Sequence, residues 1–141
     1  MLSPEFERQL RDIYATTTTI AAVGATTNED KPGYFIPRYM QSQGYRIVPI
    51  NPRYDEILGE TCHPSLEDVD VPIDVVDVFR PSAETPAIAR QAVDIGAKVL
   101  WLQPGIASDE AAAIGHDAGM VVIMDRCIAM THAELDLGEG P

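Results

Sequence analysis

Residues 18–26 read Thr18-Thr19-Ile20-Ala21-Ala22-Val23-Gly24-Ala25-Thr26. The run up to the valine is apolar and partly β-branched, which is typical of a strand buried on both faces. The glycine that follows permits a sharp turn and a close approach to the backbone, because it has no Cβ. A buried strand that ends in such a turn and leads into a helix is the first unit of a nucleotide-binding α/β fold, so we expect the rest of the chain to build on it.

Strand and helix patterns alternate along the rest of the chain. Strands are expected at about residues 18–23, 46–50, 73–79, 99–102 and 121–124. Helices are expected at residues 1–15, 33–43, 82–95 and 108–119, with a short helical turn near 65–68. This alternation predicts a Rossmann-like α/β fold, a doubly wound five-stranded parallel sheet with helices on both faces. Right-handed crossovers favour the strand order 3-2-1-4-5, with the strands numbered along the chain.

Three details of this organisation are expectations. Pro37 conflicts with a helix over 33–43, because proline is tolerated only in the first turn, and this allows the helix to start later than Gly33. No linker divides the chain, so residues 1–141 are expected to form one domain. The polar, glycine-containing tail at 136–141 is expected to be frayed.

Composition and charge argue against several classes of function. The 141 residues are 45% hydrophobic and 23% charged, and no apolar run approaches the length of a membrane span. The net charge of −12 argues against a nucleic-acid partner, because a phosphate backbone requires a basic surface. Cys62 and Cys127 form no CxxC pair and have no metal-ligand spacing with the histidines, and the acidic N-terminus is no signal peptide. We therefore expect a cytoplasmic chain with reduced thiols and no metal site.

Basic side chains follow the strands although the chain is acidic. Arg53, Arg80 and Arg126 each come just after an expected strand, and Lys31 lies in the first loop. The carboxyl ends of parallel strands meet at one edge of the sheet, where ligands bind in such folds. Positive charge at this edge favours a phosphorylated ligand, and the alternative is a solvated rim of arginines without a ligand.

NAD is the obvious candidate ligand, and the sequence argues against it. The G-x-G-x-x-G fingerprint is absent, because no second glycine follows Gly24 until Gly33. The second strand ends in Asn51-Pro52-Arg53 and carries no acidic residue for the ribose hydroxyls. An arginine at that position can accept a phosphate on the ribose, so an NADP-binding oxidoreductase domain remains an alternative.

Six short motifs in register resemble a known family. They are Val23-Gly24-Ala25-Thr26, Pro49-Ile50-Asn51-Pro52, Ile57-Leu58-Gly59, Val76-Asp77-Val78-Phe79-Arg80-Pro81, Trp101-Leu102-Gln103-Pro104-Gly105-Ile106 and Met124-Asp125-Arg126-Cys127. In this order they resemble the stand-alone CoA-binding proteins of the YccU-like family, which are similar to the CoA-binding domain of the succinyl-CoA synthetase α subunit. The resemblance extends over about residues 16–134 and implies a Rossmann-like fold that binds coenzyme A across the strand ends.

The resemblance also implies which residues hold coenzyme A. The first turn would be lined by Gly24, Ala25 and Thr26, and phosphate would be reached by Lys31. The adenosine phosphate end would be held by Asn51, Pro52 and Arg53. The adenine or pantetheine arm would pack along Val78, Phe79, Arg80 and Pro81, and the thiol end would lie near Gln103 and Gly105.

The α subunit of the synthetase also has a phosphorylated histidine in a second domain, and we expect no counterpart of it in this chain. His116 falls on an expected helix and His132 in the tail, outside any matching motif. We therefore expect non-catalytic binding of coenzyme A or a short acyl-CoA, as a carrier, a sensor or an enzyme partner. A protein-interaction module that has lost its ligand is a third alternative, and Cys127 is a candidate for a mixed disulfide with the thiol of coenzyme A.

Overall fold

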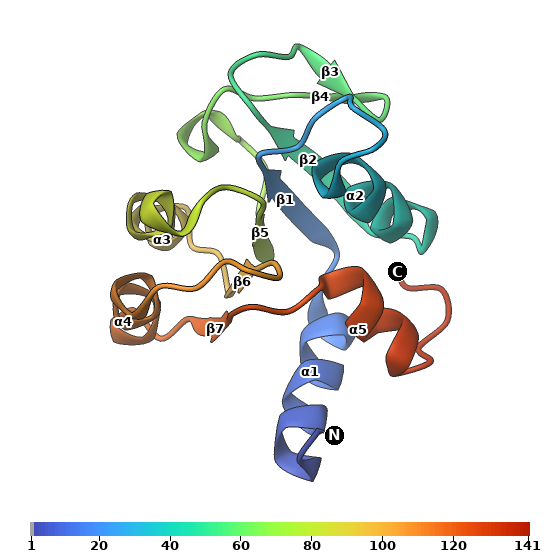
Figure 1. The fold of residues 1–141 in the computed structure, drawn as a ribbon, viewed down its shortest axis with the longest axis vertical. Helices are drawn as coiled ribbons and strands as arrows, with labels where there is room; N and C mark the ends of the chain where they lie inside the picture. The colour runs from blue at the N-terminus through green and yellow to red at the C-terminus, as the bar shows by residue number, and fades with distance from the viewer. Residues whose placement is uncertain (1) are drawn as a thin grey trace.

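Five parallel strands form one sheet in the computed structural model, which describes residues 2–141 (Figure 1). In sheet order the strands are β2 (Arg46–Ile50), β1 (Thr19–Val23), β5 (Val75–Val78), β6 (Val99–Leu102) and β7 (Val121–Ile123). One face is covered by α3 (Thr85–Asp94) and α4 (Asp109–Asp117), the other by α1 (Pro4–Thr16), α2 (Pro32–Ser42) and α5 (Ile128–Glu134). Short 3-10 turns lie at Leu66–Asp68 and Ser82–Glu84. The predicted Rossmann-like α/β fold with helices on both faces is confirmed.

Each face of the sheet has its own apolar core, because successive strand residues point to opposite faces. In β1, Ile20 and Ala22 pack toward α1, α2 and α5, whereas Ala21 and Val23 pack toward α3 and α4. All five residues of β1 are buried. The continuous apolar run in this stretch of sequence therefore follows from burial on both faces.

The strand order differs from the prediction. Numbered along the chain, the five strands lie in the order 2-1-3-4-5, so the third strand pairs with the first, and the predicted order 3-2-1-4-5 is wrong. Pro49 in β2 supplies the reason. The Pro49 carbonyl points away from β1 and accepts a hydrogen bond from the His63 N–H (3.1 Å). The backbone nitrogen of Pro49 points to the same outer side, so its lack of an N–H removes no hydrogen bond to β1. A proline of this kind suits an edge strand and not a strand with a neighbour on each side.

Three further segments differ from the sequence prediction. A small hairpin of β3 (Glu56–Ile57) and β4 (Glu60–Thr61) and the helix α5 were not expected. The tail at 136–141 was expected to be frayed, but the Gly140 N–H donates to the Gln43 carbonyl (2.5 Å). A Cβ on Gly140 would lie 2.8 Å from the Tyr45 ring, which shows how closely this part of the tail packs.

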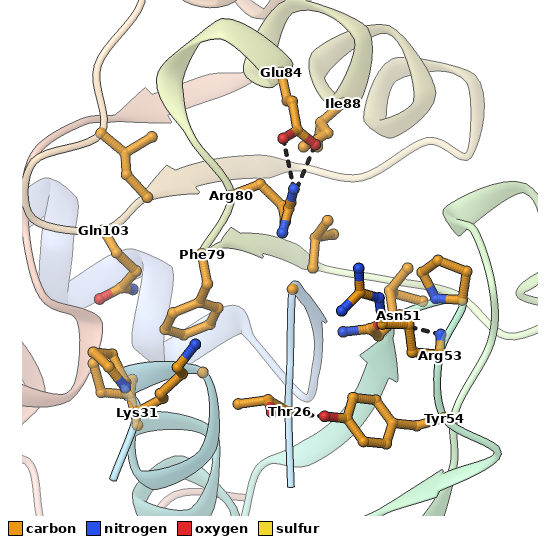
Figure 2. A pocket seen from close by; sticks show the side chains of 18 of the residues that line it. Thr26, Lys31, Asn51, Arg53, Tyr54, Phe79, Arg80, Glu84, Ile88 and Gln103 are labelled. Atoms are coloured by element: carbon orange, nitrogen blue, oxygen red, sulfur yellow. Dashed lines mark hydrogen bonds and ion pairs between the residues drawn. The ribbon is translucent and has the colours of Figure 1, made fainter. Parts of the chain in front are cut away.

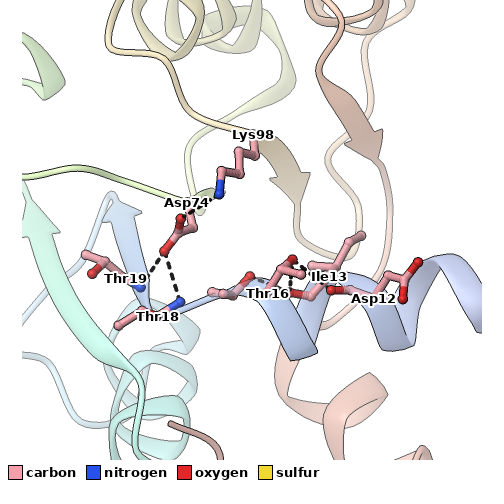
Figure 3. Close-up of polar contacts among 8 residues, drawn as sticks. Asp12, Ile13, Thr16, Thr18, Thr19, Asp74 and Lys98 are labelled. Atoms are coloured by element: carbon pink, nitrogen blue, oxygen red, sulfur yellow. Dashed lines mark hydrogen bonds and ion pairs between the residues drawn. The ribbon is translucent and has the colours of Figure 1, made fainter.

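The amino ends of the central strands are tied together by one carboxylate. Asp74 directly precedes β5, and its Oδ2 accepts hydrogen bonds from the N–H groups of Thr18 (2.9 Å) and Thr19 (3.0 Å) (Figure 3). Its Oδ1 lies 3.6 Å from the Lys98 ammonium, just before β6. The backbone N–H groups at the amino ends of these strands therefore have internal partners. The carboxyl ends of the strands are the end of the sheet that is left for a ligand.

Candidate functional site

A cleft of about 810 Å³ opens at the carboxyl ends of the strands. It lies where the chain turns from one side of β1 to the other, between β1 and β5, which is the switch point at which open α/β sheets bind ligands. The predicted site residues that line it are Gly24, Thr26, Lys31, Asn51, Pro52, Arg53, Phe79, Arg80 and Gln103. The cleft lining does not include four others, Ala25 and Val78, which are buried in the core, and Pro81 and Gly105, which are exposed.

Two glycines let the first loop pack tightly against the start of α2. Gly24 has a φ of +94°, a conformation that strains any residue with a side chain. A Cβ on Gly33 would lie 2.7 Å from the Gly24 carbonyl oxygen, and one on Gly24 would lie 3.0 Å from Cδ of Arg80. Backbone therefore forms this wall of the cleft, and a ligand can approach it closely.

Pro37 contributes to the same wall from inside α2. The helix begins at Pro32 and continues through Pro37, so the expectation of a later start is wrong. Because proline has no N–H, the Gly33 carbonyl lacks its usual donor four residues on. The Thr26 N–H donates to that carbonyl instead (3.2 Å), and this bond fixes the loop after β1 on the helix.

Asn51 joins the loops after β1 and β2. Its Nδ2 donates to the Ala25 carbonyl (2.9 Å), and its Oδ1 accepts from the Arg53 N–H (2.9 Å). The hydroxyls of Thr26 and Tyr54 lie 3.0 Å apart, and this hydrogen bond lowers the pKa of Tyr54 (Figure 2). Both polar atoms of the Asn51 side chain thus have internal hydrogen-bond partners. Asn51 therefore holds the two loops at the cleft in place relative to one another.

Positive charge at the cleft comes from Lys31, Arg53 and Arg80. Arg80 is held by Glu84 through two hydrogen bonds, Nε to Oε1 (3.1 Å) and Nη2 to Oε2 (2.7 Å) (Figure 2). This pairing raises the pKa of Arg80 and lowers that of Glu84. Arg126, which also follows a strand, does not line the cleft, because its guanidinium lies over the Phe6 ring and donates to the Thr131 hydroxyl.

A buried polar pair lies beside the cleft, and one member of it, Gln103, belongs to the cleft lining. Gln103 follows β6 and is 3% exposed, and its Nε2 donates to Oδ1 of Asp77 in β5. Within residues 2–141 the Oε1 atom of Gln103 has no hydrogen-bond partner. Burial raises the pKa of Asp77 to about 8, although the hydrogen bond from Gln103 opposes that shift.

The cysteines and histidines lie outside the cleft lining. Cys127 precedes α5, where its sulfur accepts a hydrogen bond from the Met130 N–H (3.5 Å). Cys62 is buried, which raises the pKa of its thiol. His132, expected in the tail, is buried on α5 with its Nδ1 3.0 Å from the Tyr39 hydroxyl, and burial lowers its pKa.

Among the described residues no cluster of three metal-ligating side chains occurs, and no helix there is long and apolar enough to cross a bilayer.

The structure adds cleft residues that sequence reasoning missed. Glu84, Ile88 and Gln91 line it from the start of α3 and its first turns. Their spacing of four and three residues puts them on one helical face, a pattern that was visible in the sequence. Tyr54 carried no such signal, because it lies in an irregular loop after β2.

Comparison with known proteins gives consistent relatives. YneT of Bacillus subtilis, an uncharacterized protein, is 38% identical over 125 residues, which cover 89% of this chain and 93% of that protein. A solved structure from Thermus thermophilus is 35% identical with a TM-score of 0.88, over 92% of this chain and 98% of that one. The ADP-forming acetate–CoA ligase of Methanocaldococcus jannaschii is 35% identical over 80 residues, which cover 57% of this chain and 11% of the enzyme.

The family assignment rests on a match that spans most of the chain. The family model described as a CoA binding domain matches residues 18–133, the segment from β1 to the last turn of α5. The expected resemblance to stand-alone CoA-binding proteins is thereby confirmed, and related sequence also forms part of ADP-forming acetate–CoA ligases. The chain belongs to the CoA binding domain family.

Proposed function

We propose that this protein binds coenzyme A or a short acyl-CoA in the cleft at the carboxyl ends of the strands. The observation that carries the proposal is the gathering of Lys31, Arg53 and Arg80 around this one cleft in a chain with a net charge of −12. Coenzyme A carries a 3′-phosphate and a pyrophosphate, so it needs several cations close together. The backbone wall at Gly24 and Gly33 leaves room for such a ligand.

The residues around the cleft suggest how the parts of coenzyme A would be distributed. The pyrophosphate would lie at the N-terminus of α2, where Lys31 is the capping residue and no side chain makes a capping hydrogen bond. Arg53, an exposed residue after β2, would take the 3′-phosphate. The apolar surface of Phe79 and Ile88 would pack on the adenine or the pantetheine arm.

We infer a binding role without catalysis, as a carrier, a sensor or the partner of an enzyme. The chain matches 11% of the Methanocaldococcus jannaschii ligase, so the ligase activity is not carried over to it. The cysteines and histidines, the side chains best suited to group transfer, lie outside the cleft lining. Binding and release of an intact CoA ester is the function that this arrangement supports best.

The test compares coenzyme A with dephospho-CoA by isothermal titration calorimetry. Arg53→Ala should weaken coenzyme A binding by about 10- to 150-fold and leave dephospho-CoA binding unchanged, because loss of one charge-assisted hydrogen bond costs about 1.5–3 kcal/mol. Arg8→Ala, an exposed change on α1, is the matched control and should alter neither affinity. Equal losses for both ligands in Arg53→Ala would contradict the assignment of the 3′-phosphate to this arginine.

NADP is a second candidate because Arg53 follows β2, where a ribose phosphate is read in dinucleotide-binding folds. The missing second and third glycines of the fingerprint oppose it. NADP in the same calorimetric series separates the two ligands. Binding of NADP without binding of coenzyme A would overturn the proposed function.

A further inference from the structure

Asp77 is a buried carboxyl group beside the cleft that has no cation next to it. It is 1% exposed, and its neighbours in the sheet register are Ala22 of β1 and Trp101 of β6, which are both uncharged. Its one side-chain hydrogen bond joins it to Gln103, an uncharged amide that belongs to the cleft lining. Among residues 2–141 no ion pair involves Asp77. A negative charge on this group would therefore lie uncompensated directly behind the lining of the cleft.

Three other titratable groups lie on the elements packed around Asp77. Burial, and after it the charge of Asp77, raise the pKa of the Tyr14 phenol on α1, which donates its hydrogen to the Ile128 carbonyl. Cys127 and Arg126, which precede α5, act on the same phenol. The guanidinium of the arginine lies over an aromatic ring and donates to a threonine hydroxyl, so it has partners of its own. None of these groups supplies a counter-charge in contact with Asp77.

This environment favours the protonated form of Asp77. Removal of a carboxylate from water without a cation partner is costly, and the neutral acid avoids that cost. Burial raises the pKa of Asp77 to about 8, although the hydrogen bond from Gln103 opposes that shift. At neutral pH the group therefore holds a proton, and it releases this proton in mildly alkaline solution.

The charge on Asp77 matters because the ligand proposed above is itself an anion. Lys31 lies on the same side of the cleft as Gln103, and within residues 2–141 no ion pair joins it to Asp77 (Figure 2). In the free protein the cations of the cleft attract an ionised Asp77 from a distance. Phosphate groups neutralise these cations and add negative charge, so they make the ionisation of Asp77 less favourable. By linkage, the ligand and the proton each favour the binding of the other.

We propose that Asp77 couples ligand binding to a proton: the anionic ligand binds best when this carboxyl is protonated, and its binding in alkaline solution draws one proton from the buffer onto the carboxyl. The inference rests on the proposed function, because it requires a phosphorylated ligand in the cleft. It assigns Asp77 no contact with the ligand. The consequence is a site whose affinity falls in mildly alkaline solution although its own cations keep their charge.

The test titrates the wild-type protein with acetyl-CoA, which has no S–H to ionise, in a calorimeter at several pH values and in two buffers of different ionisation enthalpy. If the bound ligand makes the ionisation of Asp77 about tenfold less favourable, the affinity should fall about fivefold between pH 7 and pH 9. About half a proton should then be taken up per ligand near pH 8.5. A constant affinity without proton uptake would overturn the inference.

Three variants identify the group that takes up the proton. Asp77→Asn keeps the shape of the side chain and cannot ionise, so proton uptake and the alkaline loss of affinity should both disappear. Cys127→Ser removes the thiol near Tyr14, and Asp12→Asn is an exposed change on α1; both should behave as the wild type does. A wild-type profile in Asp77→Asn, or loss of proton uptake in Cys127→Ser or Asp12→Asn, would overturn the assignment to Asp77.

A measurement on the wild-type protein makes the outcome independent of the folding of the variants. The ¹³C resonance of the Asp77 carboxyl should titrate at higher pH in the presence of acetyl-CoA than in its absence. An identical titration in both states would overturn the inference. Failure of acetyl-CoA and coenzyme A to bind at any pH contradicts the proposed function itself, whereas binding that is independent of pH contradicts the role of Asp77 alone.

Discussion

Asp74 and Asp77 belong to the same short segment of chain but lie toward opposite ends of the parallel strands. Asp74, at the amino ends of the strands, accepts from two backbone N–H groups and pairs with Lys98. Asp77, near the carboxyl ends, is 1% exposed and accepts one side-chain hydrogen bond, from Gln103. The Asp74 carboxylate has internal partners at the amino ends of the strands. Asp77 lies beside Gln103, whose Oε1 atom has no hydrogen-bond partner among residues 2–141.

This difference separates a group that stabilises the fold from a buried group whose partner lines the cleft. A half-buried carboxylate with three internal partners contributes to the free energy of unfolding. A fully buried carboxyl group in an apolar strand lowers that free energy, and the one side-chain hydrogen bond of Asp77 goes to Gln103, which lines the cleft. We therefore expect stability to depend mainly on groups at the amino ends of the strands and binding mainly on groups at their carboxyl ends.

The largest effect on stability is expected at Asp74. Asp74→Ala removes the acceptor of the Thr18 and Thr19 N–H groups and should lower the free energy of unfolding by about 2–3 kcal/mol, measured in urea. Lys98→Met removes only a 3.6 Å ion pair whose lysine side chain is 68% exposed, so it should cost less than about 0.5 kcal/mol. Equal losses would show that the ion pair, and not the backbone bonds, holds this edge.

At the opposite edge, Gly33→Ala should damage both stability and binding. The new Cβ would lie 2.7 Å from the Gly24 carbonyl oxygen, which is backbone and can move only with the loop. We expect a loss of about 1–3 kcal/mol in unfolding free energy. Because the displaced loop forms the cleft wall, coenzyme A affinity should fall as well, which calorimetry checks. An unchanged affinity would separate this wall from the binding site.

The pH dependence of stability should report Asp77. Its pKa rises from 3.8 to about 8 on folding, so between these values the folded protein holds a proton that the unfolded chain releases. The free energy of unfolding therefore falls as pH rises from about 4 to about 8, and this contribution is constant above that range. In Asp77→Asn the fall should be absent, which parallel urea titrations at several pH values measure. Identical pH profiles would contradict the burial argument.

The smallest effect is expected at the Arg80–Glu84 pair. Both side chains are 48% exposed, so Glu84→Gln should change the unfolding free energy by less than about 0.5 kcal/mol. Arg80 would be released for the ligand, and coenzyme A should bind about two- to threefold more tightly at low salt. Glu110→Gln breaks the Arg90 pair, which lies outside the cleft lining, and serves as the control. Weaker binding in Glu84→Gln would mean that the pair presents Arg80 in its binding position.

The main elements of the fold could be predicted because their signals are local. Apolar runs located the strands, and the cap at Ser3 and the glycine at position 96 marked helix ends that the structure places within about two residues. The strand order depends on long-range pairing, and Pro49, whose geometry suits an edge strand, is a local sign of it. The hairpin β3–β4 and the helix α5 are too short to give a periodic pattern.

The candidate site residues that line the cleft include several that lie just after strands, namely Asn51, Arg53, Arg80 and Gln103. Arg126 follows the same rule and does not line the cleft, because a side chain can turn to either face of the sheet and this one turns to Phe6. The hydrogen bond between Asp77 and Gln103 could not be predicted from the sequence, since the two residues lie on or after neighbouring strands and meet only in the observed register.

The most direct test of coenzyme A binding is thermal unfolding of the wild-type protein with coenzyme A, dephospho-CoA, acetyl-CoA, NADP and NAD in parallel. A ligand at ~100 times its dissociation constant adds about 2.7 kcal/mol to the stability of the folded state. For a chain of this size that should raise the unfolding midpoint by about 5–10 °C. We predict such a shift with coenzyme A and none with NAD or NADP. No shift with coenzyme A, or a shift with NADP alone, would contradict the account.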